Sequence, residues 1–131
     1  MSEGRAVSVL GFDFGTKRIG VAIGNRLLGT ARGLRTVTEQ GDAKFAAITQ
    51  LIKEWQPDAL VVGVPRHPDG QPHDMTQRAL KFAGQLRGRF RLAVIEVDER
   101  YTSAEAQAQG ARDLDAASAA LILEQYFREH P

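Results

Sequence analysis

A strand that ends in an aspartate and turns directly into a second strand constrains this fold more than any other feature. Residues 6–14 alternate between two faces, and Asp13 falls in phase with Val9 near the end of the segment. Residues 15–18 supply a glycine-containing turn, and residues 19–23 form a second apolar strand. The pattern therefore predicts a β-hairpin that carries an acidic residue at the end of its first strand.

The rest of the chain alternates between helical and extended patterns. A third strand is predicted within residues 29–37, and Asp42 is expected to cap a helix that Pro57 ends. Further strands are predicted at 59–64 and 92–97, and a loop at 65–72. Three more helices are predicted: one that Asp74 caps and that ends near 88, a short one at 102–110, and a buried one from Asp115. This order predicts an α/β fold with a central mixed five-stranded sheet flanked by helices.

Composition narrows the class of protein. With 131 residues, the chain is expected to form one domain, residues 1–131. Seventeen basic and sixteen acidic residues give a net charge of +1, so nucleic-acid binding would need a local basic patch. The chain has no cysteine, which excludes disulfides and thiolate chemistry. No apolar run reaches the length of a membrane span, so a cytoplasmic protein without membrane contact is expected.

Three acids are candidates for one site: Asp13, Glu99 after a later strand, and Asp115 at the start of the last helix. Carboxylates that converge at one end of a sheet are typical ligands of Mg²⁺ or Mn²⁺, and such sites hydrolyse phosphodiesters. Each acid also has a purely structural interpretation. Asp13 could be a turn aspartate, Glu99 an ion-paired strand end, and Asp115 a helix N-cap. Glu99 is in phase with the apolar residues of its strand, whereas its neighbour Asp98 shares the more polar face with Glu96. Glu99 is therefore the better candidate of the two.

Basic residues near these acids are candidates for contacts with phosphates. Lys17 and Arg18 are expected beside Asp13 because they lie in the turn that follows it. Further nucleic-acid-binding candidates are Arg66, Arg78, Lys81, Arg100 and Arg112, although a solvated helix face is the ordinary interpretation for those near the second helix. The histidines show no metal-binding spacing.

Five segments together resemble the YqgF/RuvX family of RNase H-like nucleases over essentially the whole chain. The matching segments are residues 12–22, 61–65 with 69–70, 76–83, 98–106 and 115–119. The resemblance implies an RNase H-like fold with Asp13, Glu99 and Asp115 as catalytic, metal-binding acids. Only eight residues separate Ala106 from Asp115, fewer than the resemblance leads one to expect.

The resemblance implies a metal-dependent endonuclease with a two-metal site for Mg²⁺ or Mn²⁺. Its expected substrate is the 5′ end of pre-16S rRNA, processed during ribosome biogenesis, and a monomer or weak homodimer is expected. A Holliday junction resolvase is the alternative, and would require a dimer. Two rivals of other classes are an actin-like ATP binder, which requires two such domains, and a non-catalytic nucleic-acid-binding module.

Overall fold

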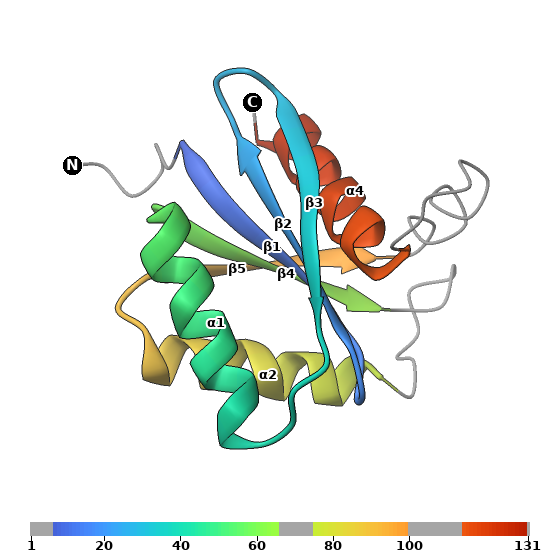
Figure 1. The fold of residues 1–131 in the computed structure, drawn as a ribbon. Coiled ribbons are helices and arrows are strands. Elements are labelled where there is room, and N and C mark those ends of the chain that lie inside the picture. Colours follow the sequence, from blue (N-terminus) through green and yellow to red (C-terminus); the bar gives the residue numbers. More distant parts are fainter. Residues whose placement is uncertain (1–6, 66–74, 100–113, 131) are drawn as a thin grey trace.

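The computed structural model describes residues 7–65, 75–99 and 114–130, except for the side chains of Glu99 and Leu114. A single mixed sheet runs through its centre (Figure 1). Its five strands are β1 (Ser8–Phe14), β2 (Ile19–Asn25), β3 (Thr30–Val37), β4 (Ala59–Pro65) and β5 (Ala93–Glu99).

The strand order in the sheet is β3-β2-β1-β4-β5. Strands β1, β2 and β3 form an antiparallel meander, whereas β1, β4 and β5 run parallel to one another. The parallel strands therefore end at the same edge of the sheet, where open α/β sheets place their sites.

Helices cover both faces of the sheet (Figure 1). Helices α1 (Asp42–Trp55) and α2 (Thr76–Arg89) lie on one face, and α4 (Leu114–Glu129) crosses the other. No helix in the described part of the chain is long and apolar enough to cross a membrane.

Two hydrophobic cores result, one on each face of the sheet. Leu10 and Phe12 of β1 point into the core beneath α1 and α2, where Phe82 packs edge-on against Phe12. Val9 points into the second core, beneath α4. Gly11 lies under α4, and a β-carbon there would come within 2.6 Å of Leu123 Cγ. Alternate side chains of β1 therefore point into different cores, as the alternation in the sequence predicted.

The predicted order of elements is confirmed for the described residues, with several local differences. Strand β3 fills most of the range predicted for it. Strand β5 extends to Glu99, so this residue ends the strand rather than following it. The predicted short helix at 102–110 lies outside the described residues.

The prediction that Asp42 caps α1 is wrong. The N-cap is Gly41, with a φ of 59°, and Asp42 is the first helical residue, with no side-chain capping hydrogen bond. A left-handed φ suits glycine because it has no β-carbon, so the backbone determines the helix start here. The other expected cap, Asp74, lies outside the described residues, and Met75 occupies the N-cap of α2.

Candidate active site

Asp13 lies near the C-terminal end of β1 and is partly buried. Its register partners are glycines on both sides, Gly20 of β2 and Gly63 of β4. Side chains of directly paired residues normally lie about 5 Å apart and fill this space. With glycine at both positions, neither register partner places a side chain beside Asp13.

Asp115 reaches the same place from the opposite end of the chain. It lies in the first turn of α4, and this turn packs so closely on β2 that a β-carbon on Gly20 would overlap the Asp115 carbonyl oxygen. Gly33 of β3 allows a similar approach, since its β-carbon would lie 2.8 Å from that of Ala116. Because Gly20 is also the partner of Asp13, the fold brings Asp13 and Asp115 to one point on the α4 face.

Glu99 is the last residue of β5, and its backbone pairs with Pro65 of β4. Only β4 separates β5 from β1, and Val97 is the β5 residue level with Asp13. Glu99 lies two residues beyond Val97, so the backbones of Glu99 and Asp13 are about 12 Å apart at the same edge of the sheet. The side chain of Glu99 lies outside the described residues. Helix α4 holds the end of β5, because Gln125 Nε2 donates a 2.8 Å hydrogen bond to the carbonyl of Asp98.

Among the side chains that the structure describes, no three acids or histidines gather closely enough to hold a metal ion. The described part of the site contains the two carboxylates of Asp13 and Asp115. Both are partly buried, and both offer the oxygen ligands that Mg²⁺ and Mn²⁺ prefer. The donor chemistry therefore fits a divalent cation, with the third predicted ligand outside the described side chains.

Arg18 forms an ion pair with Asp115, the second acid of the site. Its Nε lies 3.5 Å from Asp115 Oδ2, while its side chain stays 67% exposed and that of Asp115 30% exposed. Arg18 thus links the β1–β2 turn to the start of α4. An exposed guanidinium at this position remains accessible to a phosphate group.

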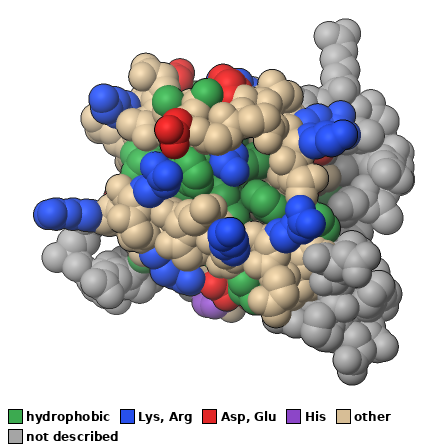
Figure 2. Space-filling view, turned by 90° about the horizontal axis from the view of Figure 1, so that it is seen from below, with side chains coloured by type: hydrophobic (Ala, Val, Ile, Leu, Met, Phe, Trp, Pro, Cys, Tyr) green, Lys and Arg blue, Asp and Glu red, His purple; other side chains and the backbone are tan. Residues whose placement is uncertain are grey.

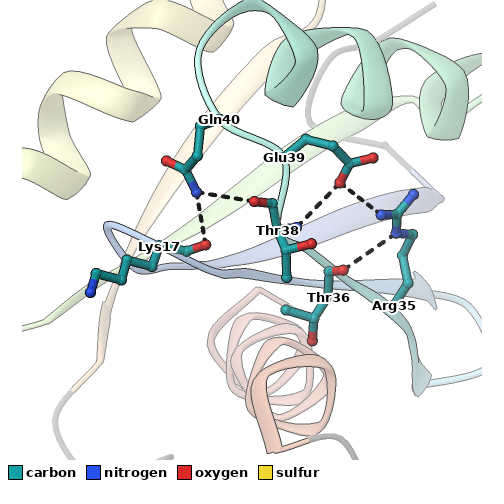
Figure 3. Close-up of polar contacts among 6 residues, drawn as sticks. All are labelled: Lys17, Arg35, Thr36, Thr38, Glu39 and Gln40. Carbon is teal, nitrogen blue, oxygen red and sulfur yellow. Dashed lines mark hydrogen bonds and ion pairs between the residues drawn. The ribbon is translucent and has the colours of Figure 1, made fainter.

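A hydrogen-bond network missed by the sequence analysis holds the other half of this turn (Figure 3). Gln40 Nε2 donates to the carbonyls of Lys17, at 3.0 Å, and Thr38, at 3.1 Å. Beside it, Glu39 pairs with Arg35 at 2.9 Å, and hydrogen bonds from its own backbone N–H and from neighbouring groups lower the pKa of its carboxyl. The segment between β3 and α1 therefore fixes the backbone of Lys17, and the Lys17 side chain extends away into solvent.

The remaining basic candidates divide into two groups. Arg78 and Lys81 are exposed on α2, on the sheet face opposite α4. Arg66, Arg100 and Arg112 lie outside the described residues. No sequence signal pointed to Gln40, because its role depends on a contact between distant segments.

The fold defines the class of protein. The arrangement of an antiparallel three-strand meander extended by two parallel strands, with helices on both faces, is RNase H-like. RuvC of T. thermophilus, solved in complex with a Holliday junction substrate, superposes with a TM-score of 0.63 over 93% of this chain and 94% of that chain. Its sequence is 16% identical, so this likeness establishes the fold alone.

Sequence similarity establishes the family. Residues 7–129 match the family described as RuvX, Holliday junction resolvase. A relative from Albidiferax ferrireducens bears the provisional name pre-16S rRNA nuclease. It is 60% identical over 119 residues, covering 91% of this chain and 76% of the relative. A relative of the same name from a Polaromonas species is 59% identical over 122 residues, covering 93% and 88%. The chain belongs to the RuvX family, as the sequence motifs predicted.

Proposed function

We propose that this chain is a metal-dependent endonuclease that processes the 5′ end of pre-16S rRNA. The observation that carries the proposal is the meeting of Asp13 and Asp115 at Gly20, at the sheet edge where β5 also ends in Glu99. A nucleic-acid binder without catalysis gains only repulsion from carboxylates placed near phosphates. The names of the relatives support pre-16S rRNA as the substrate.

Asp13, Glu99 and Asp115 would hold Mg²⁺ or Mn²⁺, most simply as a two-ion site. When bound, such ions supply an activated water and neutralise charge on the leaving oxygen. Asp13 lies between two glycines on the α4 face, and Asp115 approaches on the same face. Arg18 and Lys17, on the adjoining turn, bind the phosphate groups beside the scissile bond. A monomer suffices for cleavage of a single strand.

Resolution of Holliday junctions is the second candidate function, favoured by the description of the matching family. Both functions use the same hydrolytic chemistry, so the acids do not separate them. Symmetric junction cleavage needs two active sites and therefore two copies of the chain.

One side-by-side assay tests the proposal. Purified protein is incubated with Mg²⁺ or Mn²⁺ and either a pre-16S leader RNA or a synthetic four-way DNA junction. We expect cleavage of the RNA, its loss on chelation of the metal, and its loss in Asp13→Asn with RNA binding retained or tightened. Wild-type cleavage rates in Asp13→Asn would refute the assigned acids. Paired symmetric nicks in the junction with the RNA intact would instead support the resolvase function.

A further inference from the structure

A pocket of about 240 Å³ opens on the sheet face opposite Asp13, at the same end of β1. Phe14 follows Asp13 in the strand and points to the opposite face, where it stacks on Phe82 of α2. The pocket draws its walls from β1, from the β1–β2 turn, from the first turn of α1 and from α2. Its lining residues are Phe14, Thr16, Lys44, Arg78, Lys81 and Gln85.

Three of these residues are cations contributed by two helices. Among the residues that the structure describes, no acidic side chain forms an ion pair with Lys44, Arg78 or Lys81. The first turn of α2 also contains no acid to offset its positive helix end. Like charges gathered around a concave surface raise the local positive potential, and an anion relieves that repulsion. Figure 2 shows basic side chains distributed around exposed hydrophobic surface on this side of the molecule.

Phe14 gives the pocket a rigid apolar wall. Its ring centroid lies 4.9 Å from that of Phe82, at an interplanar angle of 29°, so the ring is held in place by stacking. Cationic groups beside a fixed aromatic ring suit a nucleotide, whose phosphate contacts the cations while its sugar or base contacts the ring. Thr16 and Gln85 add hydrogen-bonding groups to the same pocket.

The β1–β2 turn connects this pocket to the candidate active site. Thr16 lines the pocket, and Arg18, two residues later, contacts Asp115 on the other face. A strand bound at the acids therefore needs only to pass over this turn to reach the three cations.

We propose that the pocket binds a backbone phosphate of the substrate strand, on one side of the scissile bond, with Phe14 supporting the attached sugar or base. This inference rests on the proposed nuclease function and adds a second point of attachment for the substrate. It assigns Lys44, Thr16 and Gln85 to substrate binding. Arg78 and Lys81 would then bind the same phosphate.

The test measures binding of a labelled single-stranded pre-16S leader RNA to Asp13→Asn protein across a salt series. Lys44→Gln, Arg78→Gln and Lys81→Gln are added singly, and Lys53→Gln, which neutralises an exposed cation at the other end of α1, is the matched control. Each pocket variant should weaken binding about three- to tenfold at 0.15 M salt and reduce the slope of log affinity against log salt by about 0.7. The control should remain within about twofold.

Urea unfolding of each variant shows whether the fold is intact, and amide NMR shifts supply a measurement that needs no substitution. Titration of the labelled protein with a short RNA trinucleotide should move the resonances of Thr16 and Gln85. If all three pocket variants bind the leader RNA like the control while the wild-type protein still cleaves it, the pocket assignment is wrong and the nuclease function stands. If the wild-type protein cuts no RNA but the trinucleotide still shifts Thr16 and Gln85, the nuclease proposal fails and the pocket remains a nucleotide site.

Discussion

The first turn of α4 rests on Gly20 so closely that a β-carbon there would overlap the carbonyl oxygen of Asp115. Gly20 is also the direct register partner of Asp13. One residue without a side chain therefore sets the separation between two acids that lie near opposite ends of the sequence. Since the obstructing atom belongs to the backbone, a larger residue can be accommodated only if the start of α4 moves.

We expect Gly20→Ala to reduce RNA cleavage at least tenfold, because it displaces Asp115 from Asp13. Overpacking of this kind also costs about 1–3 kcal/mol in the free energy of unfolding. Cleavage rates should be compared under conditions where urea titration shows both proteins to be folded. Wild-type cleavage by folded Gly20→Ala would show that the approach of α4 does not position Asp115.

The control for this substitution is Gly24→Ala, in the same strand. A β-carbon at Gly24 would come within 2.8 Å of Phe127, at the other end of α4. This variant should lose stability through crowding in the core while retaining most of its cleavage activity per folded molecule. The pair separates an effect on the site from an effect on packing in general.

Arg18→Gln tests the contact between the turn and α4. The Arg18 side chain is 67% exposed, so its ion pair with Asp115 should contribute less than about 1 kcal/mol to stability. If Arg18 also binds a substrate phosphate, cleavage should fall about tenfold, and Arg18→Lys should restore part of it because the charge is kept. Arg87→Gln, which breaks the ion pair with Glu96 between α2 and β5, is the control and should cleave normally. An unchanged rate in Arg18→Gln would remove Arg18 from the substrate-binding group.

The fold was largely predictable because the pattern of apolar residues that marks each strand lies within a few consecutive residues. The hairpin followed from alternation up to Asp13 and a glycine-containing turn, and β4 followed from a continuous apolar run. Helix α1 shows the limit of local patterns, because Asp42 has the chemistry of a cap while Gly41 has the backbone freedom that the cap position uses. Side-chain identity alone does not reveal which of two adjacent residues adopts a left-handed φ.

The candidate site was predictable in part. Asp13 and Asp115 stood out because acids are unusual at a strand end and at the start of a buried helix, and the structure brings them together. The contacts of Gln40 with Lys17, and of Gln125 with the end of β5, join segments distant in sequence, so no local pattern reports them. The pocket around Lys44 depends in the same way on how α1 and α2 lie side by side.

Gln40→Ala tests whether the β3–α1 segment holds the turn in a productive position. Loss of its hydrogen bonds to the carbonyls of Lys17 and Thr38 should cost about 0.5–1.5 kcal/mol in stability. A looser turn should raise KM for the leader RNA several-fold and change kcat less. Gln40→Glu should behave like the alanine variant because a carboxylate cannot donate to a carbonyl. A wild-type KM in Gln40→Glu would show that these bonds do not position the turn.

Asp58 gives the fold a dependence on pH that is independent of the candidate site. Its Oδ2 accepts hydrogen bonds from the backbone N–H groups of Ser8 and Val7, both at 3.0 Å, which ties the start of β1 to the start of β4. The bond from Ser8, followed by that from Val7, lowers the pKa of the Asp58 carboxyl below its usual value of 3.8. Because the folded state favours the ionised form, this contribution is fully present above the unfolded pKa and is lost as pH falls through the lower folded value.

Asp58→Asn should therefore destabilise the protein at pH 7 by at most about 1 kcal/mol, since the group is exposed and a neutral amide oxygen is a weaker acceptor. As pH falls below the usual value of 3.8 the unfolded carboxyl is protonated first, and the folded carboxyl follows only at a lower pH, so the difference between the two proteins should shrink toward zero across that range. Urea unfolding from pH 2.5 to 7 measures this difference directly. Glu54→Gln, which removes an exposed acid on α1, is the control for the loss of one negative charge. A constant difference between wild-type and Asp58→Asn protein across this range would mean that the ionised carboxyl is not what holds the two strands together.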